Sequence, residues 1–407
     1  MHVIFVEPAF PRNQREFVRG LAATGARVTG IGEASPEALD SELKGYMDHY
    51  EQVGSVVHEE ALLQAVRQCQ KMGWVDRLEA TVEAHILPTA NVREKCGIPG
   101  ISVQSAYLCR DKPAMKDALR SAGLPCAASA GVASVAEAEA FVERVGYPII
   151  LKPRAAAGAA GTFRVDDAAG LKRVVVESGI DRGLSAAAEE FIEGHEGFYD
   201  TVSVDGRPVH EFACHYYPNV LEGMRERWIS PQFIATNRLE AAPGYDEVRR
   251  LGLDVVKTLG LTTTATHMEW FYGPKGLNFS EIGCRPPGVG AWDLYCAGNE
   301  MDLYGEWARA IVELPPKQLP TRRFSAGMIS LRPDRDGRIA GYSGLDAVRS
   351  EFGSCLIDSH LPPVGTPTQP VEAGFMANAW MRFRHPDYDS LRQILDTVGQ
   401  TVKVHAG

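Results

Sequence analysis

The sequence predicts a mixed α/β (α+β) protein that combines a parallel sheet near the N-terminus with antiparallel strands further along the chain. An apolar run at 2–6, an amphipathic stretch at 14–23 and a second apolar run at 26–31 come first. A strand, a helix and a strand within about 30 residues form a βαβ unit, whose two strands are parallel. Later, two alternating runs flank Asp205-Gly206, a dipeptide typical of hairpin turns between antiparallel strands.

The elements between these two landmarks alternate between helix and strand. Helices are expected at 111–125 and 135–145, and strands at 147–152, 162–165 and 186–192. Pro113 suits the first turn of its helix, and Gly123 with Pro125 ends that helix. The strand that closes on Lys152 is strongly apolar, as in a buried sheet.

The second half of the chain is expected to be richer in strands. We expect helices at 245–259, 299–312 and about 387–398, and strands at 262–272 and 277–282. Gly260 ends the first of these helices. Residues 321–407 are strand-rich, and Asp336-Gly337 is a hairpin signal within them.

Composition excludes several classes of protein. A length of 407 residues predicts two to four domains or subdomains. A net charge of −10 argues against nucleic acid as a partner, since phosphate contacts need a clustered basic face. No apolar run reaches the ~20 residues that span a membrane, and the N-terminus lacks a basic leader. Eight scattered cysteines without a CxxC pair fit a reducing compartment rather than a zinc site, so we expect a soluble, cytoplasmic protein.

Lys152 is the first residue that points to chemistry. A lysine at the end of a buried strand needs an anion or must lose its proton. The loop after it has Gly158 and Gly161 among alanines, so its backbone amides can approach a phosphate closely. From these residues alone, phosphate binding and a tight strand connection with a solvent-reaching lysine remain alternatives.

Glu269 and Glu281 form a carboxylate pair. If the hairpin turns through Pro274, Lys275 and Gly276, Glu269 faces Glu281 across the two strands. Two facing carboxylates repel each other unless a cation lies between them, and a Mg²⁺ that bridges to phosphates would serve. The alternatives are an exposed, solvated pair, or a register slip of one residue that separates the two side chains.

Two further residues lie beside this pair. Arg285 follows Glu281 by four residues, in a loop that proline and glycine keep out of a helix. A fixed arginine could stabilise charge that develops during phosphoryl or acyl transfer, or could form a structural ion pair with Glu269 or Glu281. His267 should share the face of Glu269, where it could contact the substrate or the metal, or be a structural histidine.

The order of these motifs resembles the ATP-grasp superfamily. The motifs are Asp111-Lys112, YPIILKP at 147–153, EEFIEGHE at 189–196, Glu269, and EIGCRP at 281–286. The resemblance runs from about residue 1 to 320 and continues in a C-terminal lobe like that of carboxylases. It implies an ATP-grasp fold with an N-terminal Rossmann-like lobe, a flexible lid subdomain and a strand-rich C-terminal lobe. The implied domains are 1–108, 109–187, 188–318 and 319–407, and the third is the catalytic subdomain.

The resemblance also implies a site for ATP and Mg²⁺. Lysines that match Lys112 and Lys152 contact the phosphates, and the loop 155–161, with Gly158 and Gly161, is the lid over them. The adenine hinge matches Glu189, Glu190, Phe191 and Ile192, the ribose ligand matches Glu196, and the metal ligands match Glu269 and Glu281. From the residues alone, the hinge acids also fit a solvated strand end. One departure is Gly283, where the family often has an asparagine that binds a second Mg²⁺.

Within the superfamily, a carboxylate–amine ligase is the expected function. Biotin carboxylases carry a valine-glutamate-histidine stretch after the arginine, whereas this chain reads PPGVGAWDLY at 286–295 and has no biotin-accepting lysine motif. Such a ligase phosphorylates a carboxylate, releases ADP and lets an amine attack, with Arg285 and His267 as the expected catalytic residues. The expected partners are a small carboxylate, an amine, and a second copy of the chain in a homodimer.

Alternatives to this function stay open. One is another ATP-grasp enzyme, carboxylase-type or kinase-like, and another is a nucleotide-binding protein without turnover, for which Gly283 is the only sign. Arg225, Arg227 and Trp228, in the stretch MRERWISP, could reach the acid substrate or be surface residues.

Overall fold

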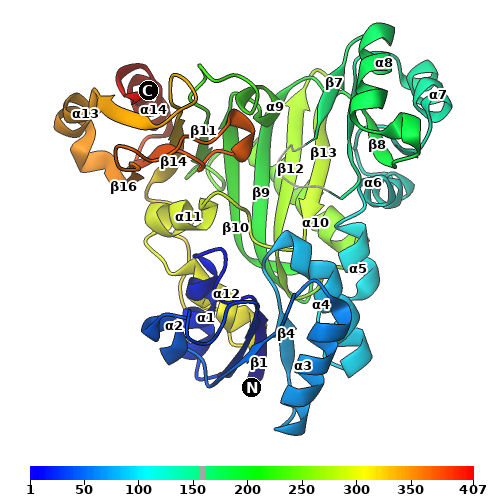
Figure 1. The fold of residues 1–407 in the computed structure, drawn as a ribbon, viewed down its shortest axis with the longest axis vertical. Helices are drawn as coiled ribbons and strands as arrows, with labels where there is room; N and C mark the ends of the chain where they lie inside the picture. The colour runs from blue at the N-terminus through cyan, green and yellow to red at the C-terminus, as the bar shows by residue number, and fades with distance from the viewer. Residues whose placement is uncertain (156–160) are drawn as a thin grey trace.

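An eight-stranded antiparallel sheet forms the centre of the computed structural model, which describes residues 1–155 and 161–407. Its strands are, in spatial order, β13 (Gly276–Gly283), β12 (Thr264–Gly273), β9 (His195–Val204), β10 (Arg207–Tyr217), β11 (Gln232–Ala235), β14 (Ser325–Leu331), β17 (Ala379–His385) and β16 (Leu356–His360). Figure 1 shows the N-terminal lobe below this sheet and two further lobes at its upper corners. The predicted mixed α/β fold is confirmed, as is the β9–β10 hairpin through Asp205-Gly206.

The N-terminal lobe is a parallel sheet with helices on both faces. Its strands are, in spatial order, β3 (His49–Gln52), β2 (Arg27–Gly32), β1 (His2–Val6) and β4 (Arg77–Glu79). Its helices are α1 (Gln14–Ala23), α2 (Ser41–Gly45), α3 (Glu59–Lys71), α4 (Ile86–Cys96) and α5 (Val103–Leu108). Ile4 and Val6 of β1 pack with α3 and α4, whereas Val3 and Phe5 pack with α1. Burial on both faces explains why this strand is apolar from Val3 to Val6, and the predicted βαβ unit is confirmed.

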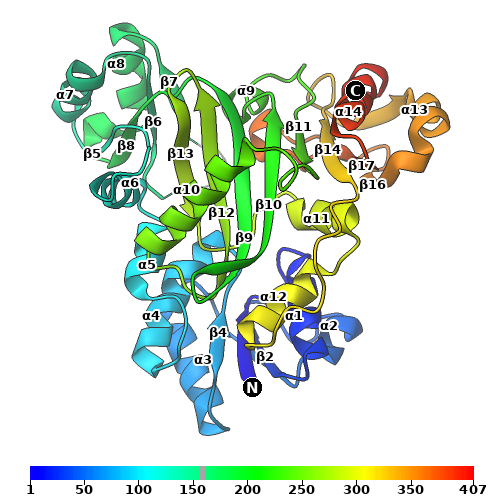
Figure 2. The same ribbon diagram turned by 180° about the vertical axis from the view of Figure 1, so that it is seen from behind.

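A helix from the second half of the chain completes the N-terminal lobe. This helix, α12 (Leu303–Ile311), places the ring of Trp307 5.0 Å from that of Phe17 on α1, measured between centroids. Figure 2 shows α12 against α1 at the foot of the central sheet. The N-terminal lobe and the central sheet are therefore joined by a shared apolar core.

The helix expected at 299–312 is found as the shorter α12, and the helix that precedes it was not predicted. The structure has α11 (Ala291–Asn299) and then α12. Glu300 ends α11 in the left-handed conformation, with φ 53°. Asp302 then caps α12 by accepting a hydrogen bond from Gly305 N at 3.1 Å. None of the helices in the described parts of the chain is both long and apolar enough to cross a membrane.

The small lobe, residues 129–190, holds a second antiparallel sheet. Its strands are, in spatial order, β5 (Ser129–Val132), β8 (Ala186–Glu190), β6 (Ile149–Pro153) and β7 (Phe163–Val165). The preceding helix is α6 (Lys112–Ser121), and α7 (Val135–Val145) and α8 (Ala168–Glu177) pack on the sheet (Figure 1). Asp111 caps α6 and Ser134 caps α7, which fixes the start of each helix close to where the sequence predicts it.

The C-terminal lobe continues the central sheet with β14, β17 and β16. Its other main elements are β15 (Ile339–Ser343), α13 (Leu345–Phe352), α14 (Tyr388–Thr401) and β18 (Lys403–Ala406). The hairpin predicted at Asp336-Gly337 is wrong, because β14 pairs with β11 and β17, whereas β15 pairs with β18 at the end of the chain. The four domain boundaries implied by the resemblance stay a prediction.

Candidate active site

A cavity of about 770 Å³ lies between the small lobe and the central sheet, a volume typical of small-molecule sites. Most of the predicted site residues line it: Lys112, Lys152, Glu189, Phe191, Ile192, Glu196, His267, Glu269, Glu281 and Arg285. Glu190 and Gly161 are not part of the lining. Gly158 and most of the predicted 155–161 lid lie outside the described residues.

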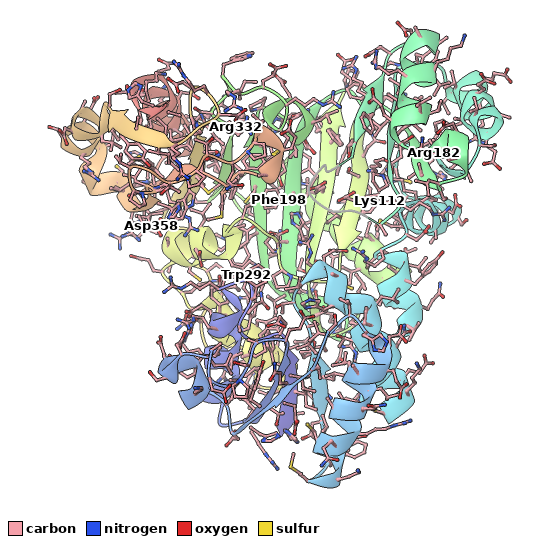
Figure 3. All side chains as sticks on the ribbon, in the orientation of Figure 1. Lys112, Arg182, Phe198, Trp292, Arg332 and Asp358 are labelled. Carbon is pink, nitrogen blue, oxygen red and sulfur yellow. The ribbon has the colours of Figure 1, made fainter. Side chains whose placement is uncertain are left out.

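One face of the central sheet forms the floor of the cavity. Alternate residues of a strand share a face, so His267, Glu269 and Phe271 of β12 point the same way. In the register between β12 and β9, Glu269 pairs with Phe198 and His267 pairs with Asp200. Figure 3 shows Phe198 over the central strands, with Lys112 on the side of the small lobe.

Glu269 and Glu281 face each other as the sequence predicts, but the hairpin differs from the expected one. Gly273 pairs with Gly276, so the turn has two residues rather than three. A bulge at Ser280 then shifts the register by one residue, which restores the pairing of Glu269 with Glu281. Gly276 adopts the expected left-handed conformation, with φ 75°.

Lysines and glutamates form a buried cluster beside this pair. Lys152 Nζ lies 2.9 Å from Glu189 Oε2 and 3.5 Å from Glu281 Oε2, and Lys112 Nζ lies 3.4 Å from the same atom of Glu281. Burial alone would raise the pKa of Glu281, but attraction to Lys112 and Lys152 lowers it to about 2. Burial would lower the pKa of Lys152, but Glu189 and Glu281 together raise it above its ordinary value. The strand-end lysine is therefore charged, as anion binding requires.

Lys116 is a residue of this cluster that the sequence analysis missed. Its Nζ lies 2.6 Å from Glu189 Oε2, its side chain is 1% exposed, and burial lowers its pKa. A signal was present, because Lys112 and Lys116 are four residues apart and share one face of α6. Glu189 Oε1 is buried and accepts no hydrogen bond among the described residues, so an acceptor stays open at the predicted hinge.

The rest of the predicted hinge divides between the cavity and the outer surface. Phe191 and Ile192 line the cavity, and the guanidinium of Arg164 lies 4.3 Å from the centre of the Phe191 ring. Glu190 instead pairs with Lys275, and its Oε2 accepts a hydrogen bond from the backbone N of Ala128 at 3.1 Å. Its carboxylate is therefore turned away from the position expected for an adenine contact.

Glu196, the predicted ribose ligand, is buried at the start of β9. Its Oε2 accepts a hydrogen bond from Val220 N at 2.6 Å, and its own backbone N donates to Asn219 Oδ1 at 3.0 Å. Burial and the nearby charge of Glu269 raise the pKa of Glu196 to about 8. A protonated carboxyl can both donate and accept, which suits contact with hydroxyl groups.

Arg285 is held by a carboxylate from the N-terminal lobe. Its Nε donates to Glu83 Oε2 at 2.6 Å, and Arg110 donates to Glu83 Oε1 at 2.9 Å. This pairing replaces the structural ion pairs that the sequence analysis considered for Arg285. A Cβ at Gly283 would lie 3.1 Å from Glu83 Oε2, so a longer side chain there would press on this ion pair. A glycine at position 283 therefore leaves room for the ion pair that anchors Arg285.

His267 stands between two acids. Its Nδ1 lies 2.7 Å from Asp200 Oδ1, and its Nε2 lies 3.7 Å from Glu269 Oε1. The other oxygen of Asp200 accepts a hydrogen bond from the hydroxyl of Tyr295. Burial opposes a charge on the ring, but Asp200 and Glu269 raise the pKa of His267 to about 9. The charged ring therefore lies within ion-pair distance of Glu269 and helps to orient its carboxylate.

The free energy of unfolding should depend on pH through His267. Its pKa is about 9 in the folded chain and about 6.5 in an unfolded one, so its stabilisation is complete below pH 6.5 and is lost as the pH rises through about 9. Relative to His267→Gln, the wild-type chain should lose about 3 kcal/mol across this range. Urea unfolding at a series of pH values, without nucleotide or metal, measures the difference. If the free energy of unfolding changed with pH in the same way in both proteins, the charged state of His267 would be contradicted.

Of the three loop residues that could reach a substrate, one lies at the cavity. Arg225 lines the cavity and donates to Thr162 O at 2.9 Å. Arg227 pairs with Asp336 of the C-terminal lobe, and Trp228 is 79% exposed. Arg225 therefore joins this loop to the small lobe, whereas Arg227 and Trp228 are surface residues.

Comparisons with known proteins agree with this geometry. Residues 111–193 match the family model described as the ATP binding domain of the carbamoyl-phosphate synthase L chain. The L-arginine-specific L-amino acid ligase of Bacillus subtilis is 29% identical over 251 residues, which are 60% of this chain and 60% of that protein. The alanine–anticapsin ligase of Bacillus subtilis (strain 168) is 26% identical over 235 residues, 52% of this chain and 48% of that protein. The matches thus span about half of the length of these relatives, or slightly more.

The fold is also found among solved structures. The L-amino acid ligase from Bacillus licheniformis superposes with a TM-score of 0.77 at 17% identity, covering 100% of this chain and 98% of that one. At this identity the likeness concerns the fold. Together with the nucleotide-binding match at 111–193 and the curated relatives, it shows that the chain belongs to the ATP-grasp superfamily.

Proposed function

We propose that this protein is an ATP-dependent, ADP-forming ligase that phosphorylates the carboxylate of one amino acid and joins it to the amine of another. The observation that carries the proposal is the anchored Arg285 in the same cavity as the facing carboxylates and the charged Lys152. The names of the two curated relatives, an L-arginine-specific L-amino acid ligase and an alanine–anticapsin ligase, support amino acids as substrates. The expected homodimer stays a prediction.

The residues present fit a nucleotide with Mg²⁺. No group of three or more histidines, cysteines, aspartates and glutamates suited to a metal ion is found in residues 1–155 and 161–407. Glu269 and Glu281 alone would leave most positions around Mg²⁺ to phosphate oxygens and water, which is how this ion commonly binds with nucleotides. Lys112 and Lys152 would hold the phosphates, and the open acceptor of Glu189 would face the adenine amino group. The metal supplies charge neutralisation at the transferred phosphoryl group.

Arg285 has the main catalytic role in this proposal. Phosphorylation of the acid gives an acyl phosphate and ADP, and attack by the amine then creates a negatively charged oxygen on the former carboxyl carbon. A guanidinium fixed before the reaction stabilises that charge without reorganisation. Collapse of this species releases phosphate, which can take up the proton that the attacking nitrogen loses, and leaves the amide bond. His267 contributes by holding Glu269 in place, so positioning and charge rather than a dedicated base account for the rate.

The anchor of Arg285 should matter for turnover. Glu83→Gln keeps the volume of the side chain but removes the charge that fixes Arg285, so kcat should fall by about 10²-fold. The KM for ATP should change much less, because the predicted phosphate ligands are untouched. Steady-state kinetics of ADP release measure both, with Glu300→Gln, a half-exposed acid paired with Arg323, as the matched control. An unchanged kcat would show that Arg285 needs no anchor.

The proposed activity is tested by ADP and phosphate release from Mg-ATP with pairs of amino acids. We expect release only when an acid and an amine are both present, with a stable product that contains both. Release that depends on bicarbonate would favour a carboxylase-type enzyme, and ADP without free phosphate would favour a kinase-like one. ATP binding without turnover for any pair would contradict the ligase and favour a nucleotide-binding protein.

A further inference from the structure

The cavity has a second end that the nucleotide site does not account for. The predicted metal strands β13 and β12 form the side of the sheet near the small lobe (Figure 1), and β10 lies beyond β9. The lining residues at this far end include Tyr216 on β10, Met224 after α9 (Val220–Gly223), Val289 after β13 and Phe375 from the C-terminal lobe. We call these four residues the apolar subsite.

The apolar subsite is built on the protein core. Tyr216, Met224 and Phe375 are each less than a tenth exposed and belong to one buried cluster, against which Val289 packs. The ring of Tyr216 lies 6.1 Å from that of Phe375 and 5.0 Å from that of Phe198, measured between centroids. These contacts fix the shape of the subsite, so it selects a ligand group by size and polarity.

The exposed charged groups near the apolar subsite lie at its rim, whereas the carboxylates of Glu196, Asp200 and Glu269, whose charges act on Tyr216, lie on β9 and β12. Glu222, Arg225 and Glu226 line the cavity but are exposed. Arg225 donates to Thr162 O, and Glu226 accepts from the indole of Trp228. A charged group placed against Met224, Val289 and Phe375 would lose its hydration, which is costly.

The apolar subsite begins next to the reaction centre. Phe198, which touches Tyr216, is the cross-strand partner of the predicted metal ligand Glu269. The group nearest the transferred phosphate must be the carboxylate that receives it. A side chain on the same molecule can then extend from that carboxylate over Phe198 toward β10.

We propose that the apolar subsite binds the side chain of the amino acid whose carboxylate is phosphorylated, and that this amino acid is therefore apolar, in the class of leucine, methionine and phenylalanine. The inference rests on the proposed ligase function and specifies its first substrate. It makes no demand on the amine, which approaches after the acid has been activated.

Hydroxylamine makes the test independent of the natural amine, because it traps an acyl phosphate as a hydroxamate. ADP and hydroxamate are measured with Mg-ATP, hydroxylamine and single amino acids: leucine, methionine, phenylalanine, alanine, arginine, lysine, aspartate and glutamate. We expect kcat/KM for the three large apolar acids to exceed that for the four charged ones by at least about tenfold. Phe375→Ala should lower kcat/KM for phenylalanine by about tenfold or more and change that for alanine less.

Two further variants keep the test decisive. Phe375→Leu preserves an apolar wall if the alanine variant folds poorly, and it should shift preference among the apolar acids only. Phe10→Ala, at a 74% exposed position in the N-terminal lobe, is the matched control and should leave the profile unchanged.

Charged acids as good as the apolar ones would overturn the inference while leaving the ligase in place. A preference for arginine that disappears in Glu222→Gln would also overturn the inference, because it would show that a charged residue at the rim selects the substrate. Apolar selectivity found for the amine instead of the acid would also overturn it. The absence of ADP and hydroxamate with every acid, with ATP binding retained, would contradict the proposed function itself and with it the inference.

Discussion

Arg285→Met should lower kcat for ligation by about 10³-fold and leave Mg-ATP binding nearly unchanged. Removal of one fixed donor from a developing oxyanion costs about 10²–10³ in rate, and arginines that stabilise phosphoryl transfer contribute about 10³–10⁵. Arg285 is placed to act in both phosphoryl transfer and attack by the amine, because Glu83 holds its Nε and its side chain lines the cavity. Steady-state ADP release and a separate titration of ATP binding distinguish the two effects.

Two variants sharpen this test. Arg285→Lys keeps the charge but lacks the Nε that pairs with Glu83, so it should recover only a small part of the activity. Arg323→Met removes an exposed arginine paired with Glu300 and should behave like the wild type. Loss of ATP binding in Arg285→Met, with kcat preserved at saturation, would assign Arg285 to the nucleotide rather than to the reaction.

Glu281→Gln should reduce ADP release by about 10³-fold, because metal-assisted charge stabilisation is worth several kcal/mol. The amide of glutamine is a poor ligand for Mg²⁺. The substitution also removes the negative charge that Lys112 and Lys152 both contact. ADP release as a function of Mg²⁺ concentration measures the change, which higher Mg²⁺ should only partly restore. Glu190→Gln alters a hinge glutamate outside the cavity lining and is the matched control. Full activity of Glu281→Gln at ordinary Mg²⁺ would remove Glu281 from the metal site.

Elements set by local signals were predictable from the sequence. The helix at 135–145 is found at the same residues because Ser134 caps it and its apolar residues recur at helical spacing. The pairing of Glu269 with Glu281 was predicted for a three-residue turn and is produced by a two-residue turn with a bulge at Ser280. Local turn chemistry placed the two carboxylates together, but it could not reveal the compensating bulge.

Features set by distant contacts were not predictable. The Asp336-Gly337 signal suggested a hairpin, yet β15 pairs with β18, and no local pattern encodes that choice. Glu83 lies in the N-terminal lobe, 202 residues before its partner Arg285, and an isolated glutamate carries no mark of such a role. Lys116 could have been found from its helical spacing to Lys112, but its pairing with Glu189 requires α6 to lie beside strand β8 of the small lobe.

Transfer of oxygen from the acid to phosphate distinguishes an acyl phosphate from simple hydrolysis of ATP. An amino acid with an ¹⁸O-labelled carboxylate is incubated with Mg-ATP and an amine, and the released phosphate is examined by mass spectrometry. Because an acyl phosphate passes one carboxylate oxygen to phosphate when the amine attacks, we expect one ¹⁸O atom in each phosphate released when both carboxylate oxygens are labelled. Phosphate without label, formed alongside ADP, would show that the carboxylate is never phosphorylated and that the protein is not a ligase of this type.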